Sequence, residues 1–120
     1  MNKKFSWKKK TSILIGRFQP FHEGHFKLFL SGLKKSGQVS ILVMDSYKVG
    51  KKNPIKFAKV KKIIIEKLKK YSGKYNIIKI PVTKEIIYGR KVGYKIRKVR
   101  LSKKIQIISG TQIRKKLNIK

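Results

Sequence analysis

The chain alternates between short apolar runs and longer segments whose apolar residues recur with helical spacing. The short runs predict strands at 11–16, Val39–Met44 and Tyr75–Ile80. Two segments between them predict helices, because their apolar residues are three or four positions apart: Phe26, Phe29, Leu30 and Leu33 in the first, and Phe57, Val60, Ile64, Leu68 and Tyr71 in the second. Gly37 and Ser72-Gly73 are expected to end these helices. Strands that alternate with helices indicate a βαβ architecture with a parallel sheet.

The rest of the chain carries weaker patterns. Residues 1–10 form a basic lead-in, in which Trp7 is expected to pack on the edge of the sheet. Short strands are also expected at Glu85–Tyr88 and Ile105–Ile108, whereas Lys48–Pro54 is a polar loop and 91–104 show no clear pattern. We therefore predict one α/β domain over residues 1–120: a Rossmann-like fold with a parallel sheet of about five strands, covered by helices on both faces.

Composition narrows the class of protein. A chain of 120 residues forms one domain and can bury a real core. The absence of cysteine excludes a disulfide framework and a thiolate metal site, and it favours a reducing cytoplasm. No stretch approaches the roughly 20 apolar residues that span a bilayer, and no signal peptide is recognised. We expect a cytoplasmic protein that does not insert into a membrane.

The formal net charge is +30, because 34 basic residues face only four acidic ones: Glu23, Asp45, Glu66 and Glu85. One interpretation is a surface for nucleic acid or another polyanion. The other is compositional drift, since the sequence is rich in lysine and isoleucine, both of which have A/T-rich codons. The lysines are spread over the whole chain rather than gathered in one stripe, which favours drift. Either origin predicts salt-sensitive, non-specific attraction to polyanions.

The strongest chemical signal follows the first strand directly and leads into the first helix. It reads Gly16-Arg17-Phe18-Gln19-Pro20-Phe21-His22-Glu23-Gly24-His25. A strand that passes through a glycine turn into a helix N-terminus favours a bound phosphate, because free N–H groups and the helix dipole lie there. His22 and His25 are three residues apart and can donate hydrogen bonds to a phosphoryl group. We expect His25 to point away from the apolar stripe of the helix and to contribute little to packing.

A second segment, Ser109–Arg114, follows the strand expected at Ile105–Ile108. Ser109 and Gln112 have capping-box spacing, so a helix with free N–H groups should begin there. Both segments begin where strands end, and both should therefore face one crevice. Asp45 also follows a strand; it either reaches the crevice and contacts base, ribose or acceptor, or is a loop cap or salt-bridge partner. Three further residues are expected either to contact base, ribose or acceptor or to be structural: Tyr88, Gly89 and Arg90.

The first segment resembles the GRFQPFHxGH signature of the HIGH-motif nucleotidylyltransferases, a superfamily with a cytidylyltransferase-like domain. The second resembles its I-S-S/A-T-x-I-R signature, although Gly110 stands where the family has serine or alanine. The form of the first motif is most similar to that of small adenylyltransferases and ATP-sulfurylase-like domains. The resemblance covers the whole chain in outline, and its specific evidence lies in these two motifs.

The resemblance implies an enzyme that transfers a nucleotidyl group, adenylyl above all, from a nucleoside triphosphate to a phosphate- or sulfate-type acceptor and releases pyrophosphate. Its catalytic residues here would be His22, His25 and Arg114. The nucleotide and its phosphates would be bound by Gly16, Arg17, Phe18, Gly24, Ser109 and Thr111. In an alternative assignment, Arg17 does not bind the nucleotide but holds the loop or contacts the second substrate. Since no carboxylate cluster marks a protein-built metal site, Mg²⁺ would be held mainly by the nucleotide phosphates and water.

Two other functions are compatible with the sequence. The first is a CTP-dependent cytidylyltransferase. The second is a degenerate, non-catalytic domain that binds nucleotides or polyanions, a hypothesis motivated by the lysine content and the short chain. Retention of the phosphate-binding residues in both motifs speaks against the second. The expected partners are ATP or another nucleoside triphosphate and a small anionic acceptor, and the sequence leaves open whether the chain also forms an oligomer.

Overall fold

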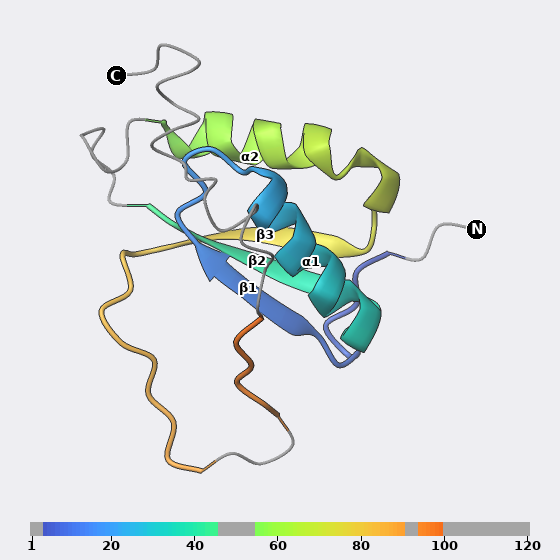
Figure 1. Ribbon diagram of the computed structural model, residues 1–120, viewed down its shortest axis with the longest axis vertical. Helices are drawn as coiled ribbons and strands as arrows, with labels where there is room; N and C mark the ends of the chain where they lie inside the picture. Colours follow the sequence, from blue (N-terminus) through green and yellow to red (C-terminus); the bar gives the residue numbers. More distant parts are fainter. Residues whose placement is uncertain (1–3, 46–54, 91–93, 100–120) are drawn as a thin grey trace.

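The computed structural model describes residues 4–45, 55–90 and 94–99. Its sheet has three strands, β1 (Ser12–Gly16), β2 (Val39–Met44) and β3 (Tyr75–Ile80), which run parallel in the order β1-β2-β3 (Figure 1). Helix α1 (Glu23–Ser36) connects β1 with β2, and α2 (Phe57–Lys67) precedes β3. The α/β class and the parallel sheet are thus confirmed. Three of about five expected strands lie in the described residues, and the strand expected at Ile105–Ile108 lies outside them.

One face of the sheet forms the core together with both helices. Residues in register across the strands, such as Leu14, Ile41 and Ile77, share this face. Side chains from both helices join the same core, and these residues are almost fully buried: Phe29 from α1 and Val60 and Ile64 from α2. Two right-handed crossovers that step in the same direction across a sheet place their helices on the same side. The expectation of helices on both faces therefore does not hold for the described part.

The opposite face of the sheet is also apolar, as expected for strands of a parallel sheet. Its alternate residues are apolar except for Ser40 and Asn76, which are in register with Ile13; the apolar ones are Ile13 and Ile15, Leu42 and Met44, and Ile78 and Ile80. Ile13 is 67% exposed, while the other five apolar residues are half-buried. Neither of the two described α-helices packs on this face.

Helix α1 packs closely on the sheet. Its Gly32 is buried, and a Cβ atom there would lie 3.0 Å from the Cβ of Ser12 and 3.3 Å from Cγ2 of Val39. The Ser12 hydroxyl donates a hydrogen bond of 3.2 Å to the Gly32 carbonyl. The helix ends at Gly37, as predicted: its φ of 79° is left-handed, and its N–H donates to the Leu33 carbonyl at 2.7 Å.

The second helix is shorter than the predicted segment Phe57–Tyr71. Its α-helical part ends at Lys67, and a 3₁₀ turn, η1 (Lys69–Tyr71), continues to the predicted end. Leu68 lies between the two and is fully buried. The ring of Tyr71 packs against Phe26 and Phe29 of α1, with centroids 6.1 and 5.5 Å apart. The tightened last turn thus belongs to the contact between the two helices.

The N-terminal segment is attached at the edge of the sheet where the strands begin. Gln38, just before β2, binds Ser6 twice: it accepts from the Ser6 N–H at 3.0 Å and donates to the Ser6 carbonyl at 2.8 Å. Trp7 does not pack on the sheet edge as expected. Its side chain is 78% exposed, and its ring contacts Phe5, 5.4 Å between centroids.

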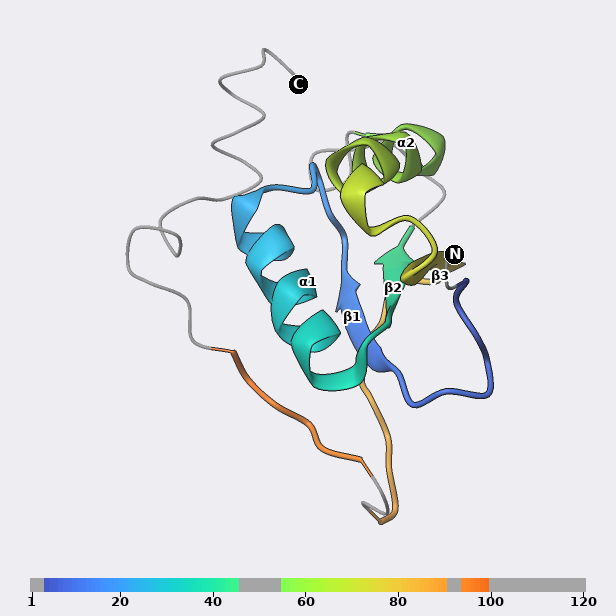
Figure 2. The same ribbon diagram turned by 90° about the vertical axis from the view of Figure 1, so that its right-hand side faces the viewer.

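The strand expected at Glu85–Tyr88 is absent: residues 81–90 have no regular secondary structure and are mostly exposed. Figures 1 and 2 show this segment extending away from the sheet, far from the start of α1. Within the described residues it has no neighbouring strand, and isolated strand backbone cannot form ladder hydrogen bonds. No helix of the described part is both long and apolar enough to cross a bilayer.

Candidate functional site

The loop between β1 and α1 is buried although it has no regular secondary structure. Phe18 and Phe21 are each 2% exposed, and Gln19 is 7% exposed. The Gln19 side chain donates to the Ile55 carbonyl at 3.0 Å and accepts from the Ile55 N–H at 2.8 Å. Buried polar groups in proteins are normally hydrogen-bonded in this way. These two bonds attach the loop to the residue two positions before α2.

Gly16 and Phe18 are packed against each other at the start of this loop. A Cβ atom on Gly16 would lie 3.1 Å from two ring carbons of Phe18, so glycine leaves the space that this ring occupies. Phe18 itself has a φ of 54°. A left-handed backbone is unfavourable for a bulky residue and persists where the surrounding contacts hold it. The Gln19–Pro20 peptide bond that follows is cis.

Helix α1 begins with a reciprocal cap made by the two histidines. His22 is the N-cap, and its Nδ1 accepts a hydrogen bond from the Gly24 N–H at 3.0 Å. The His22 N–H donates in turn to Nδ1 of His25 at 3.1 Å. The arrangement corresponds to a capping box, in which two side chains satisfy free donors of the helix terminus. The two imidazole rings stack with their centroids 3.9 Å apart.

These caps assign the tautomer of both rings. A nitrogen that accepts a hydrogen bond carries no proton, so in each neutral imidazole the proton lies on Nε2. Each histidine therefore offers one Nε2–H donor that the cap does not use. Both rings are half-buried and keep some exposure to solvent. The start of α1 thus presents two Nε2–H donors, one from each histidine. Hydrogen bonds from the backbone to Nδ1 determine which ring nitrogen carries the proton.

Both histidines are held in the neutral form. Burial lowers the pKa of His22 below its ordinary value. Burial, and to a lesser extent the neighbouring His22, lowers the pKa of His25 to about 3. A ring that loses hydration on folding cannot carry a charge without a compensating partner. At neutral pH the pair therefore acts through N–H dipoles rather than through positive charge.

The ring of His25 is part of the packing of the loop, which corrects the expectation that it contributes little. Its centroid lies 4.8 Å from Phe18, edge to face, and 5.5 Å from Phe21. The two phenylalanine rings contact each other at 5.6 Å. Helical spacing places His25 away from the apolar stripe of its own helix, but the loop before the helix folds back and covers that side.

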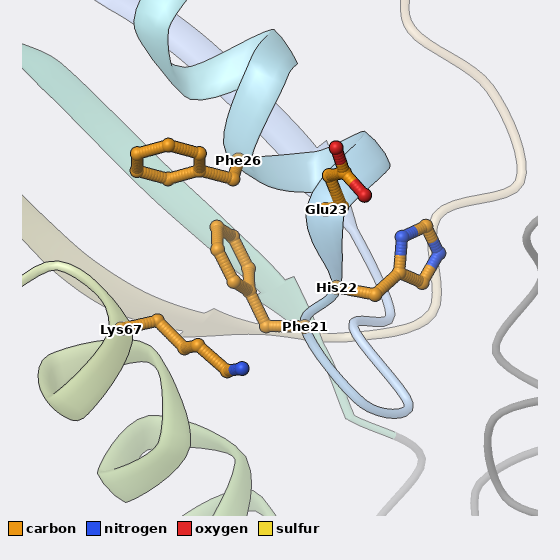
Figure 3. Close-up of a pocket in the computed structure, with 5 residues that line it drawn as sticks. All are labelled: Phe21, His22, Glu23, Phe26 and Lys67. Atoms are coloured by element: carbon orange, nitrogen blue, oxygen red, sulfur yellow. The ribbon is translucent and has the colours of Figure 1, made fainter. Parts of the chain in front are cut away.

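A groove of about 270 Å³ lies beside the histidines, between the first turn of α1 and the end of α2. Its lining consists of Phe21, His22, Glu23, Phe26 and Lys67. Figure 3 shows the rings of Phe21 and Phe26 near Lys67, with the side chains of His22 and Glu23 directed away from them. Glu23 is exposed in the first turn, where its negative charge favours the helix N-terminus.

The structure brings several of the other predicted residues to the same edge of the sheet. Asp45 directly follows β2, and its N–H donates to the Ile80 carbonyl at 2.9 Å. It lies at the carboxyl edge with Gly16, because Gly16 and Val43 are in register. Arg17 is half-buried in the loop. Gly24 is buried, and its N–H is engaged by His22, so this particular donor serves the cap.

Other predicted residues are not brought to the histidines. Tyr88, Gly89 and Arg90 are exposed in the segment that extends away from the sheet (Figure 2). The Tyr88 ring contacts Tyr94, whose hydroxyl donates to the Arg90 carbonyl at 3.5 Å. The second expected set of phosphate ligands lies outside the described residues: Ser109, Thr111 and Arg114.

Sequence reasoning missed the two residues that build the loop, Gln19 and Phe21. A signal existed, since Gln19 is a polar residue close to three apolar ones in a segment of only a few positions. Its hydrogen-bonding partner, however, is 36 residues away in the sequence. Among the described residues, no three His, Cys, Asp or Glu side chains gather in a way that could hold a metal ion.

Comparisons with known proteins agree with this geometry. The model of a family described as cytidylyltransferase-like matches residues 13–81, a range that contains every described helix and strand except Ser12, the first residue of β1. Nicotinamide-nucleotide adenylyltransferase of Methanococcus aeolicus is 26% identical, over 88% of this chain and 76% of that protein.

Two solved structures of a bifunctional NMN adenylyltransferase/ADP ribose pyrophosphatase from Francisella tularensis are also similar, each with 30% identity and a TM-score of 0.56 over 61% of this chain. One of them was complexed with AMP and an Mn ion. The chain spans 23% of that solved chain and 22% of the other, so the similarity concerns a part of that larger protein.

Proposed function

The chain belongs to the cytidylyltransferase-like family of nucleotidylyltransferases, and we propose that it transfers the adenylyl group of ATP to a small acceptor that carries a phosphate. An oxygen of the acceptor phosphate attacks the α-phosphorus of ATP. The bond from the α-phosphorus to the oxygen that bridges to the β-phosphorus breaks, and pyrophosphate leaves. Such a reaction needs little covalent chemistry from the protein and depends on alignment and charge stabilisation. The names of the similar proteins, all adenylyltransferases, support ATP over CTP.

The observation that carries the proposal is the pair of neutral, capped histidines at the start of α1. His22 and His25 each hold an Nε2–H donor in an orientation set by hydrogen bonds to the backbone. Donors that are oriented before the substrate binds need no reorganisation when charge develops on the phosphate oxygens. Since both rings are neutral, they stabilise that charge without giving up a proton.

The remaining roles complete the proposal. Gly16, Phe18 and Gly24 shape the loop that approaches the nucleotide, and Arg17 holds the loop or contacts the acceptor. Ser109, Thr111 and Arg114 bind the β- and γ-phosphates and then the departing pyrophosphate. Asp45 lies at the edge of the sheet where these groups would meet. A divalent cation, Mg²⁺ in this proposal, supplies further charge stabilisation and is held mainly by the phosphates and water.

The names of the relatives support one acceptor class. Their names identify nicotinamide mononucleotide as their acceptor, and we propose a mononucleotide of this kind for the present chain. Its 5′-phosphate supplies the attacking oxygen that the reaction requires.

The test is a pyrophosphate-release assay with Mg²⁺, in which ATP or CTP is combined with nicotinamide mononucleotide or with other phosphorylated acceptors. We expect release with ATP and a mononucleotide. Release with CTP in place of ATP would instead identify a cytidylyltransferase. A protein that binds ATP but releases no pyrophosphate with any acceptor would be a non-catalytic nucleotide-binding domain, and the proposal would be wrong.

A further inference from the structure

We propose that Gln19 is a positioning residue: through its hydrogen bonds to the Ile55 backbone it keeps the Phe18 and Phe21 rings against His25 and so orients the imidazole that receives the phosphate. That the imidazole receives a phosphate rests on the proposed function, whereas the positioning itself is a property of the protein without substrate. It assigns a role to a side chain that has no place of its own among the expected ligands.

Gln19 is attached to the segment before α2 by two hydrogen bonds. Its amide both donates to and accepts from the same residue, Ile55, at 3.0 and 2.8 Å. Gln19 and Ile55 are only 7% and 5% exposed, so water cannot readily replace either bond. Loss of a buried partner costs more than the bond itself contributes, because the remaining donor and acceptor stay desolvated. The loop is therefore strongly tied to the start of α2.

Two aromatic residues close to Gln19 in the loop pack against His25. Phe18 precedes Gln19 directly, and Phe21 is two residues further on. Both rings pack on His25, with centroid distances of 4.8 and 5.5 Å. Phe18 also holds a φ of 54°, a conformation that relaxes when its surroundings no longer impose it. Releasing Gln19 should therefore let these rings move and admit water to the imidazole.

The orientation of the His25 ring affects both the cap of α1 and the direction of its Nε2–H donor. Nδ1 of His25 accepts from the His22 N–H, so the same ring is also part of the cap of α1. A ring that tilts or becomes hydrated loses both the cap geometry and the direction of its Nε2–H. In oriented reactions a displacement of about 1 Å can cost on the order of 100-fold in rate.

The chain supplies a matched control in Gln38. It is also buried, 4% exposed, and its amide also binds the backbone of a distant segment, through Ser6 at 3.0 and 2.8 Å. Gln38 lies just before β2, at the edge of the sheet opposite to that of the histidines. Replacing either glutamine with methionine keeps the approximate volume and removes the hydrogen bonds.

The experiment compares Gln19→Met with Gln38→Met. In both variants we expect a lower thermal midpoint. Only Gln19→Met should shift the NMR signals of the His25 ring in the substrate-free protein and raise the pKa of His25 towards the ordinary value of 6.5. In the adenylyl-transfer assay, Gln19→Met should lower kcat by about 10- to 100-fold with a smaller change in KM, whereas Gln38→Met should retain the wild-type kcat.

An unchanged titration of His25 in Gln19→Met would overturn the proposal, as would an equal change in Gln38→Met. Should Gln19→Met fail to fold, Gln19→Asn takes its place, because its shorter amide weakens the bonds to Ile55 and adds no charge beside His25. The NMR titration needs no nucleotide and therefore separates the two hypotheses. A selective shift of His25 in a protein that transfers no adenylyl group would contradict the proposed function and leave the positioning role in place.

Discussion

The imidazole of His25 combines a structural and a proposed chemical role in one side chain. It packs between Phe18 and Phe21, and it accepts a hydrogen bond from the His22 N–H. The cap uses Nδ1, so the ring has one further hydrogen-bonding group, the neutral Nε2–H donor at the N-terminus of the helix. The side chain is thus oriented by two aromatic rings and by the helix cap before any ligand binds, which is the arrangement that preorganised binding of an anion requires.

We expect His25→Ala to lower adenylyl-transfer turnover by on the order of 100- to 1,000-fold, because it removes an oriented donor to the phosphates. It should also lower the thermal midpoint, since the ring is part of the buried loop. Turnover is measured by pyrophosphate release and stability by circular dichroism. Lys27→Ala, an exposed position one half-turn further along α1, serves as the control and should change neither. Full activity of His25→Ala would contradict the role of the histidine pair.

The protein should become less stable as the pH is lowered through the range in which histidine normally titrates. The folded state lowers the pKa of His25 from 6.5 to about 3, so folding favours the neutral ring. The stabilisation from this neutral ring is complete above about 6.5 and is lost as the pH falls towards 3. His22 shifts in the same direction. Since the chain has only four acidic side chains, the two histidines should dominate this dependence.

The check is the thermal midpoint of wild type and His25→Gln between pH 7 and pH 4. We expect a steeper decline in wild type than in the variant, which cannot titrate at this position. Parallel curves of thermal midpoint against pH would show that His25 takes up a proton in the folded protein as readily as it does in water.

At the scale of elements, the close approach of α1 to the sheet determines where its N-terminus lies. Gly32 brings the helix backbone against β1 and β2, with Ser12 bonded to the Gly32 carbonyl. The other end of the helix starts at the histidine cap, ten residues earlier in the sequence. A change in the distance between helix and sheet should therefore also be transmitted to the loop that packs on His25.

Gly32→Ala should destabilise the protein by about 1–3 kcal/mol, the usual range for overpacking. The added Cβ would lie 3.0 Å from the Ser12 Cβ and 3.3 Å from the Val39 side chain, which cannot easily move within the core. Urea denaturation measures the effect. Gly89→Ala is the matched control, because nothing lies within 4 Å of a Cβ at that position. Equal stabilities of the two variants would show that α1 can shift away from the sheet at no cost.

At the scale of the whole molecule, the charge is the dominant property. Only four acidic residues counter the 34 basic ones, which leaves a net charge of +30, and the ion pair between Lys69 and Glu66, 3.6 Å long, is exposed. Such surface pairs contribute little to stability. The core is instead apolar and lies between the sheet and its two described helices. Charge should therefore govern association with other molecules far more than it governs the fold.

We expect duplex DNA to bind with little dependence on base sequence and with an affinity that falls steeply with salt. The slope of log affinity against log salt concentration should be about −0.9 for each phosphate neutralised. Fluorescence anisotropy with several unrelated duplexes at graded salt concentrations measures both properties. A preference of roughly 1,000-fold or more for one sequence at physiological salt would contradict drift as the origin of the lysines and indicate dedicated nucleic-acid recognition.

The regular elements and the location of the candidate site could be predicted from the sequence, because both depend on local patterns. Strands and helices bury one face or one stripe, so their apolar periods are visible locally, and β1, α1, β2 and β3 lie close to where the periods predict. Gly37 ends α1 as expected because a left-handed C-cap is a local requirement. The histidines mark the start of α1 for the same reason, since capping involves only neighbouring residues.

Contacts between groups that are distant in the sequence depend on the tertiary structure. Nothing local in the sequence connects Gln19 to Ile55, or the loop before α1 to the side of His25 that faces away from the apolar stripe of the helix. The direction of the two crossovers placed both described helices on one face of the sheet. The apolar residues at Glu85–Tyr88 remain outside the described sheet, because a strand forms only where another strand offers its N–H and C=O groups. Periodicity is a property of a segment, whereas hydrogen bonds and ring contacts between segments depend on how the chain closes in space.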